Sequence, residues 1–227
     1  MQVPRIEWNI NIGGDIMTNL LSPCYPFQQA PLPFAYNALE PEIDAETMEL
    51  HYAHLFRSFV DSLNAILAEA PRLQCCSLEE LLRCCNRLPP NLRTPIMRNA
   101  GGAYSHALYF EGLTPGGSPP CGTLARVLEC TYGSLELFKA QFKARALEVF
   151  GSGYAWLAAN RAGRVCILLS ANQDTPLPQG CIPLLNIDMW EHAYFLKYQI
   201  NSAAYVDAWL RTADFGRASV VYEERFC

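Results

Sequence analysis

A proline- and glycine-rich segment, Thr114-Pro-Gly-Gly-Ser-Pro-Pro120, separates two parts of the chain that carry different hydrophobic patterns. Before it, apolar residues recur at spacings of three and four, which is the period of a helix. After it, two more helix-like stretches are followed by three apolar runs of the length of strands. These runs are Tyr154–Ala159, Val165–Ala171 and Ile182–Ile187. Because the segment has no periodicity of its own, it is the best candidate for a boundary between two regions.

The pattern predicts an α+β protein in three parts. Residues 1–30 are expected to form an N-terminal extension or arm, residues 31–117 a helical domain with a long helical hairpin, and residues 118–227 an α/β domain. In the third part, Asn160-Arg-Ala-Gly163 joins the first two apolar runs, which therefore read as a β-hairpin. The third run completes a small antiparallel sheet wrapped by helices.

Residues 1–16 look foreign to the rest of the chain. Codons for Gly13-Gly14-Asp15, just before Met17, could contain a purine-rich ribosome-binding sequence. We therefore hypothesise that Met17 is the true start and that residues 1–16 were translated from leader sequence. A peptide of the natural protein that contains Trp8 would contradict this hypothesis.

The composition limits the class of protein. Hydrophobic residues make up 51% of the 227 residues and charged residues 17%, which suits a globular chain and excludes extensive disorder. The net charge is −5 and the sequence contains no run of like charges, so neither nucleic acid nor a membrane surface is expected as a partner. The apolar runs are too short to span a bilayer, and the N-terminus lacks the pattern of a secretion signal. We therefore expect a cytoplasmic protein.

The chain contains 10 cysteines, which include the adjacent pairs Cys75-Cys76 and Cys84-Cys85 within a helical pattern. Disulfide scaffolds belong to short secreted chains with small cores, so we expect reduced thiols in a reducing cytoplasm. A zinc site in this segment is the alternative, although the spacing fits no tetrahedral ligand pattern well.

Capping residues locate the first helices. Asp44, three residues before Thr47, predicts a helix start, and Ser77 with Glu80 forms a capping box for a short helix through about Asn86. The first of these helices carries on one face Met48, His51, Leu55, Phe59, Ser62 and Ile66.

Prolines at Pro89-Pro90 and Pro95 are expected to break the second helix. The remaining predicted helices are one from about Pro95 to Phe110, two that Thr123 and Ser134 can cap with the second ending near Phe150, and two around His192–Ile200 and Ala203–Ala213.

The four histidines of the chain suggest metal chemistry. Asp188 and His192 lie four residues apart directly after an apolar strand, although such a pair alone is more often a surface hydrogen bond. His51 and His106 each lie on an apolar helix face, where a core histidine with a satisfied hydrogen bond is the commoner reading. Three inward histidines and one carboxylate together are a different matter, because this mixed donor set suits Mn, Fe or Zn.

The chain resembles the iron/manganese superoxide dismutase family from about Pro31 to Phe215. The strongest element is Asp188-Met-Trp-Glu-His-Ala-Tyr194. The other matching motifs, in chain order, are Pro33-Phe-Ala-Tyr36, Leu39-Glu-Pro41, Asn99-Ala-Gly-Gly102 followed by His106, Gly151-Ser-Gly-Tyr-Ala-Trp-Leu157 and Ala171-Asn-Gln-Asp174.

The resemblance implies a mononuclear metal site between a helical domain and an α/β domain. Its ligands would be His51, His106, Asp188 and His192, and a solvent molecule would complete the set. Gln173 matches the glutamine that hydrogen-bonds this solvent in manganese-type enzymes, whereas Gly102 stands where iron-type enzymes usually supply it. We therefore expect one Mn ion per subunit, with Fe as the alternative, cycling between +3 and +2 as superoxide becomes oxygen and hydrogen peroxide.

The resemblance also implies supporting residues and a partner subunit. Trp190, Trp156 and Tyr194 match residues that wall the cavity, with simple core packing as the other reading. Glu191 matches the residue that bridges to a ligand histidine of the partner subunit. A homodimer, or a dimer of dimers, is therefore expected.

The chain departs from the family where polar groups usually surround the metal. Phe59 replaces the gateway tyrosine, Leu55 a histidine that often hydrogen-bonds to it, and Phe195 a tyrosine across the dimer interface. Asn201 stands near the position of an arginine thought to attract the anion, and Phe110 takes the place of a tryptophan. We hypothesise that electron transfer survives while proton delivery and anion steering weaken.

Two basic residues, His54 and Arg98, could restore part of the positive potential near the site. For residues of this kind, a solvated position on the surface is the more common role. The losses keep open an alternative function, that of a non-catalytic metal-binding or structural protein. A zinc hydrolase is the least favoured of the three readings, because no free carboxylate or histidine is obviously placed as a general base.

Overall fold

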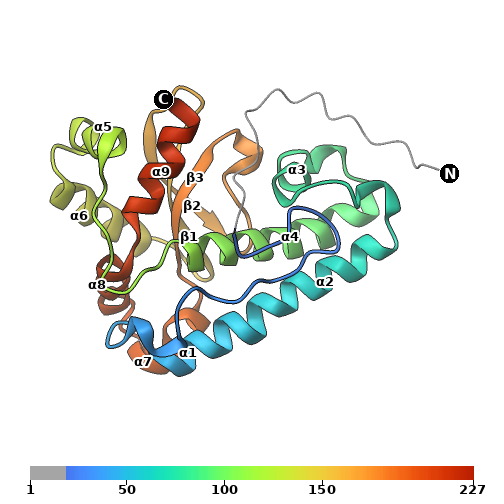
Figure 1. Ribbon diagram of the computed structural model, residues 1–227, viewed down its shortest axis with the longest axis horizontal. Helices are drawn as coiled ribbons and strands as arrows, with labels where there is room; N and C mark the ends of the chain where they lie inside the picture. The colour runs from blue at the N-terminus through green and yellow to red at the C-terminus, as the bar shows by residue number, and fades with distance from the viewer. Residues whose placement is uncertain (1–18) are drawn as a thin grey trace.

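Two long helices lie side by side in the N-terminal half of the chain and form the predicted helical hairpin (Figure 1). The computed structural model describes residues 19–227, so the hypothesis about Met17 lies outside the described residues. The sheet lies between this hairpin and the helices of the C-terminal half (Figure 1). The predicted α+β class, with a three-stranded antiparallel sheet after a helical hairpin, is confirmed. None of the described helices is long and apolar enough to cross a membrane.

The first helix of the hairpin begins where its cap predicts. The Asp44 side chain accepts a hydrogen bond from the Thr47 N–H at 2.8 Å, and α1 spans Ala45–Glu49. The helix then widens into a π-helical turn over Leu50–Phe56 before α2 continues over Arg57–Ala68.

The π turn makes the predicted apolar face partly wrong. Ser62, assigned to the inward face, is exposed. A π turn holds more residues than an α turn, so it rotates the face that follows it. From Tyr52 onward, the buried positions are Tyr52, Phe56, Val60, Leu63 and Leu67.

The second helix of the hairpin is longer than predicted. Ser77 and Glu80 form the expected capping box, and α3 spans only Leu78–Arg83. Next, α4 spans Pro90–Glu111, so it begins before Pro95 rather than at it. Proline is tolerated at the first helical position because its missing N–H would have no partner there. Pro95 costs the helix one hydrogen bond near its start without ending it.

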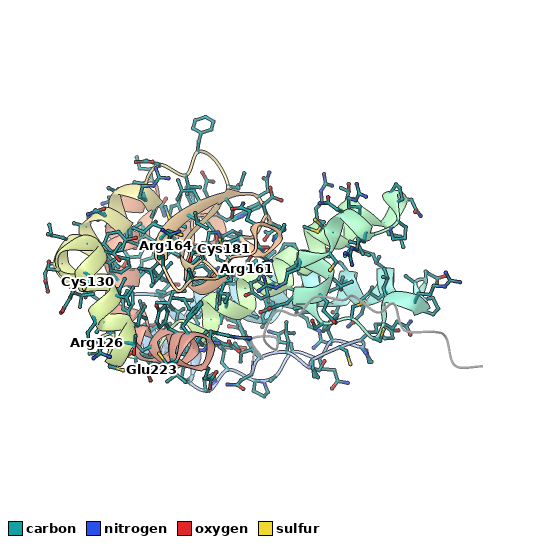
Figure 2. All side chains as sticks on the ribbon, turned by 90° about the horizontal axis from the view of Figure 1, so that it is seen from above. Arg126, Cys130, Arg161, Arg164, Cys181 and Glu223 are labelled. Atoms are coloured by element: carbon teal, nitrogen blue, oxygen red, sulfur yellow. The ribbon has the colours of Figure 1, made fainter. Side chains whose placement is uncertain are left out.

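The C-terminal half opens with α5, Gly122–Tyr132, and α6, Leu135–Ala146. Ser134 caps α6 as predicted, but α6 ends before Phe150. Thr123 is not the N-cap of α5, because the helix already begins at Gly122. The Thr123 N–H instead donates to the Glu223 carboxylate of α9 at 3.1 Å. Figure 2 shows Glu223 on α9 and Arg126 and Cys130 on α5, two helices that pack together.

The sheet has the strand order β2-β1-β3. Its strands are β1, Gly153–Ala159, β2, Val165–Ala171, and β3, Ile182–Asp188, as predicted to within one residue. All seven residues of the central strand β1 are buried. In the pairing of β1 with β3, Tyr154 lies opposite Asp188. The end of β3 is therefore held rigidly at the centre of the molecule.

The chain ends in three helices, of which the last was not predicted. They are α7, Phe195–Tyr198, α8, Ser202–Thr212, and α9, Phe215–Phe226. Short 3₁₀ turns occur at Tyr36–Leu39, Pro71–Leu73, Cys85–Arg87, Leu177–Gln179 and Glu191–Ala193. Because α9 packs on α5 and β3, it covers the side of the sheet that faces away from the hairpin.

Helix α4 approaches the loop after β2 so closely that only glycine fits. A Cβ atom added to Gly101 would lie 2.1 Å from the backbone oxygen of Gln173. A Cβ atom added to Gly102 would lie 2.4 Å from the ring of Phe59 on α2. The two glycines therefore set the distance of α4 from both of its neighbours.

We expect Gly101→Ala to destabilise the protein by about 1–3 kcal/mol, because its methyl group would overpack against backbone that no side-chain rotation can move. Without that contact, alanine in a helix interior would stabilise by up to about 1 kcal/mol. Urea unfolding of the wild type and of Gly101→Ala measures the difference between their free energies of unfolding.

Gly102→Ala is the matched comparison, because the Phe59 ring that it meets is a side chain. The loss of stability that Gly102→Ala causes should be smaller in a Gly102→Ala/Phe59→Leu double variant. A Gly101→Ala protein as stable as the wild type would refute the close approach.

Candidate metal centre

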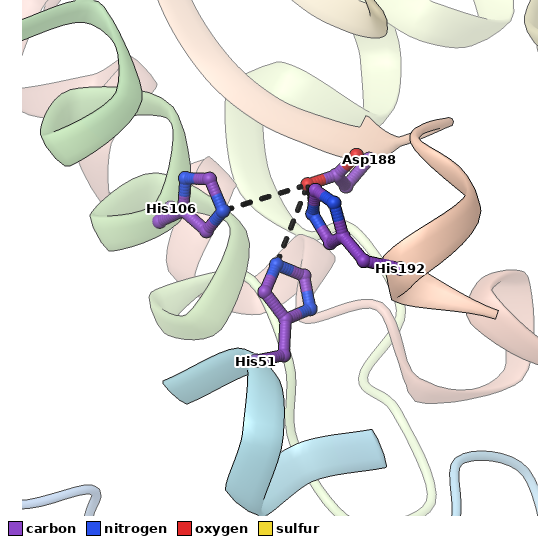
Figure 3. Close-up of side chains that lie close together, drawn as sticks. All are labelled: His51, His106, Asp188 and His192. Carbon is purple, nitrogen blue, oxygen red and sulfur yellow. Dashed lines mark hydrogen bonds and ion pairs between the residues drawn. The ribbon is translucent and has the colours of Figure 1, made fainter. Parts of the chain in front are cut away.

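Three histidines and one aspartate from four separate elements converge at the junction of the two halves (Figure 3). His51 comes from the π turn, His106 from α4, Asp188 from the end of β3 and His192 from the turn after β3. One possible ligand atom from each residue lies within 4.8 Å of the others. Among residues 19–227 no other group of histidine, cysteine or acidic side chains gathers in this way, so the cysteines of residues 75–85 form no zinc cluster.

The Asp188 carboxylate lies at the centre of the group. Its Oδ2 atom is 3.2 Å from Nε2 of His192, 3.4 Å from Nε2 of His51 and 3.9 Å from Nε2 of His106. Its Oδ1 atom accepts a hydrogen bond from the Trp190 N–H at 2.8 Å. The hydrogen bond to Oδ1 turns Oδ2 toward the imidazoles.

The orientation of His106 is set by a backbone carbonyl. Nδ1 of His106 lies 2.7 Å from the oxygen of Gly102. A carbonyl oxygen can only accept, so Nδ1 carries the hydrogen and Nε2 presents its lone pair to the cluster. The Nε2 atoms of His51 and His106 are both buried without a hydrogen-bond partner among the described residues.

Burial keeps these two imidazoles neutral. It lowers the pKa of His51 to about 4 and that of His106 to about 3. Burial alone would raise the pKa of Asp188, but the attraction and hydrogen bonding of His192, together with the attraction of His51, bring that pKa below its ordinary value. The site therefore offers one carboxylate and neutral imidazole nitrogens with free lone pairs. This donor set fits a bound Mn or Fe ion, which would satisfy the orphaned nitrogens.

The walls of the site are aromatic. The ring of Phe110 lies 4.8 Å from that of His51, and the ring of Phe59 lies 5.1 Å from that of His106. Trp190 approaches His192 to 5.6 Å between ring centroids. The His192 side chain keeps 28% of its surface exposed, whereas the other three candidate ligands keep at most 1%.

Three other sequence candidates make contacts with residues outside the cluster. The Trp156 side chain is fully buried and donates to the Ser170 hydroxyl at 2.9 Å. Tyr194 stacks on Tyr205 at 5.0 Å. Asn201, which stands near the position of the expected arginine, caps α8 by accepting from the Ala204 N–H at 3.1 Å.

Gln173 joins the site to a pocket. Its side chain is 7% exposed, its Oε1 accepts from the Tyr154 hydroxyl at 2.9 Å, and its Nε2 is buried without a partner. The pocket, of about 580 Å³, is also lined by Phe59, Arg98 and Trp190. It extends from the aromatic wall of the site to solvent.

Three buried tyrosines near the site were missed by the sequence reasoning. Tyr154 lies opposite Asp188 in the sheet. The ring of Tyr109 lies 5.2 Å from that of His51, and its hydroxyl lies 3.1 Å from the hydroxyl of Tyr205. Tyr109 is three residues after His106 on one helix, so helical spacing could have revealed it.

Comparison with known proteins supports one family throughout. The family profile "Iron/manganese superoxide dismutases, alpha-hairpin domain" matches residues 26–114, and the profile "Iron/manganese superoxide dismutases, C-terminal domain" matches residues 120–220. Superoxide dismutase [Mn] of Pseudomonas aeruginosa is 42% identical over 200 residues, which cover 88% of this chain and 98% of that protein.

Two further relatives show the same likeness. Superoxide dismutase [Mn] 3 of Leptolyngbya boryana is 41% identical over 185 residues, or 81% of this chain and 77% of the relative. Superoxide dismutase [Mn/Fe] of Methylomonas sp. is 40% identical over 195 residues, or 86% of this chain and 96% of the relative.

The buried histidines predict how the stability of the metal-free protein depends on pH. The folded-state pKa values of His51 and His106 lie below the ordinary value of 6.5, so the unfolded chain binds more protons between about pH 4 and 6.5. The free energy of unfolding should therefore be greatest above pH 6.5 and fall as the pH drops through this window. The slope should approach about 1.4 kcal/mol per pH unit for each histidine.

Urea unfolding of the metal-free protein at pH 7, 6 and 5 measures this slope. His106→Gln should remove about half of it, because one of the two histidines is then absent. His54→Gln, which changes an exposed histidine outside the cluster, is the control. An undiminished slope in His106→Gln would contradict the assignment.

Proposed function

Because the chain belongs to the iron/manganese superoxide dismutase family, we propose that it is an enzyme that converts superoxide to oxygen and hydrogen peroxide. The observation that carries the proposal is the buried cluster of one carboxylate and three imidazoles, two of them with unpaired lone pairs. A manganese or iron ion is its cofactor, and His51, His106, Asp188 and His192 are the residues that would hold it.

The bound ion supplies the one-electron chemistry, since a metal that cycles between +3 and +2 can both oxidise and reduce superoxide. The chain contributes the environment of that ion. The Asp188 carboxylate balances its charge, and the carbonyl of Gly102 holds His106 in the ligating tautomer. Phe110, which is fully buried, and Phe59 give the site apolar walls. Formation of peroxide consumes protons, and the buried Nε2 of Gln173 is a hydrogen-bond donor that can orient the group that delivers them.

Manganese is the metal that we propose, with iron as the alternative. The amide donor in this chain comes from Gln173, in the loop after β2. No side chain fits at Gly102 on α4, because even a Cβ atom there would overlap the ring of Phe59. The packing of Phe59 thus supports a site in which Gln173 alone supplies the amide, the arrangement expected of manganese-type members.

The pocket beside Gln173 is the route that we propose for the substrate. Superoxide is a small anion, and Arg93 and Arg98 line the pocket together with Phe59 and Trp190. Arg93 uses its guanidinium to hold the carbonyls of residues 85, 86 and 88. Arg98 is exposed and is therefore the cation better placed to attract an anion from solvent.

A homodimer is proposed from the surface next to His192. Glu191 is exposed one residue before His192, and the neighbouring apolar side chains of Phe195, Leu196 and Ile200 are exposed by 43%, 48% and 92%. A second copy would cover them, and the partner's Glu191 could then bond His192. Sedimentation should give about twice the chain mass of 25.4 kDa or a multiple of it. A monomer would refute the interface.

The cytoplasm is the compartment that we propose. Five of the 10 cysteines are exposed free thiols, namely Cys24, Cys75, Cys121, Cys130 and Cys227. Thiols in this number persist in a reducing compartment.

The alternative function is a metal-binding protein without efficient turnover. It is favoured by the apolar residues Phe59, Leu55 and Phe195, which stand where the family usually places polar groups. With both members of an intersubunit hydrogen bond replaced by apolar side chains, no buried group is left unpaired and the fold loses little stability.

Metal analysis of the purified protein alongside a superoxide-consumption assay tests the proposal. We expect about one Mn or Fe per chain and rapid loss of superoxide. Asp188→Ala should lose both the metal and the activity, whereas Asp174→Ala, an exposed aspartate that lines the pocket, should keep the metal. Bound metal without activity would favour the alternative function, and bound zinc would overturn both.

Phe59→Tyr tests whether the apolar wall limits proton delivery. It adds a hydroxyl at a ring that lies 5.1 Å from that of His106 and lines the pocket beside Gln173. We expect turnover at high superoxide to rise by up to roughly 10²-fold, which is the lower end of what general acid catalysis contributes. Phe59→Leu, which adds no hydroxyl, is the control. No gain in Phe59→Tyr would count against a proton-delivery deficit.

A further inference from the structure

An asparagine on β3 joins the two halves of the chain beside the candidate ligands. Nδ2 of Asn186 donates a hydrogen bond to the backbone oxygen of Ser105 on α4 at 2.9 Å. Ser105 immediately precedes His106, and Asn186 lies two positions before Asp188. Within residues 19–227, no other side-chain hydrogen bond connects α4 with β3. The contact therefore acts directly between the helix and the strand that carry these two candidate ligands (Figure 3).

Asn186 occupies a position that is otherwise suited to an apolar side chain. It is fully buried, and its neighbours Leu185 and Ile187 on β3 are buried as well. Its Oδ1 atom is buried without a hydrogen-bond partner among the described residues, and an acceptor in this condition costs free energy. The Ser105 carbonyl lies within α4 and already accepts a hydrogen bond from the helix, so it does not need the amide. Stability alone would therefore favour an apolar residue at this position.

The consequence of this hydrogen bond lies in the geometry of the site. Side chains of a strand alternate between its two faces, so Asn186 and Asp188 project from the same face of β3. Oδ2 of Asp188 lies 3.9 Å from Nε2 of His106. Apolar attraction has no preferred direction, whereas a hydrogen bond weakens steeply when its distance or angle changes. The amide thus limits the movement of α4 along β3 where the two candidate ligands face each other.

We propose that Asn186 is a positioning residue for the metal site, because its amide holds His106 and Asp188 in register before an ion binds. Side chains that form a binding site need to be held within about 0.5 Å of their productive positions. Loss of the amide should therefore weaken metal binding without weakening the fold. The inference rests on the proposed function only in its claim that the cluster holds a metal ion.

The experiment compares Asn186→Val with Asn64→Ala, each made in the full chain. The first variant removes the amide at a strand position, where a β-branched residue fits well. The second is the matched control, because Asn64 makes a similar clamp elsewhere, from α2 to the backbone N–H and carbonyl of Phe27, both at 2.8 Å. Urea unfolding of the metal-free proteins gives their stability. Competition with a chelator gives the dissociation constant of Mn²⁺, and electron paramagnetic resonance records the spectrum of the bound ion.

We expect Asn186→Val to weaken Mn²⁺ binding by roughly tenfold, the lower end of the effect of groups that orient metal ligands, and to change the spectrum of the bound ion. The metal-free variant should be at least as stable as the wild type, because the unpaired Oδ1 atom is gone. Asn64→Ala should show the reverse pattern, with lower stability but the wild-type affinity and spectrum. Asn186→Ala, which adds no bulk, should weaken Mn²⁺ binding to a similar extent and decides the matter if valine prevents folding.

Wild-type Mn²⁺ affinity and spectrum in the Asn186 variants would overturn the proposal, and so would an equal weakening in Asn64→Ala. Lower stability of Asn186→Val with an unchanged spectrum would show a purely structural role and would also overturn it. A wild-type protein that binds Mn²⁺ but consumes no superoxide would refute the proposed function instead, and the affinities would still decide the role of Asn186.

Discussion

The arrangement of buried lone pairs around the Asp188 carboxylate is the constraint on which the rest of the structure depends. Nε2 of His51 and Nε2 of His106 are buried without a hydrogen-bond partner among residues 19–227. Polar atoms in this condition cost free energy until something binds them. Because His51 and His106 come from the helical hairpin and Asp188 and His192 from the sheet side, a bound ion would hold the two halves of the chain together.

Helix α4 makes this meeting possible through its small residues. Gly101 admits the backbone of Gln173, and Gly102 admits the ring of Phe59 while its carbonyl orients His106. One short stretch of helix thus sets the positions of a candidate ligand, an amide and the aromatic wall. A larger residue at either glycine would separate elements whose spacing the site requires.

Phe59 and Leu55, which stand where the family usually places polar side chains, offer no hydrogen bonds to the site. Hydrogen bonding to the Gln173 side chain comes from Tyr154 on the sheet, whereas Phe59 of α2 contributes only an apolar ring. A site built in this way relies on a hydroxyl that is inaccessible to solvent, since Tyr154 is fully buried.

The sequence by itself determined the features that rest on local spacing. Asp44, Ser77 and Ser134 cap their helices through residues only three positions away, and the strands follow from short apolar runs. The four candidate ligands are far apart in the chain and were proposed from the resemblance to a family, whose motifs occur in order along the sequence. For such features the partner lies within one turn or one motif, so that the sequence alone contains the information.

Only the tertiary structure decided the features that depend on distant partners. The cap at Thr123 comes from Glu223, 100 positions away, and the π turn rotates the face of α2 in a way that helical spacing does not predict. Tyr154 and Gln173 meet because β1 and the loop after β2 fold together beside α4. Contacts of this kind arise from packing among several elements, and packing is a property of the folded chain rather than of any segment of its sequence.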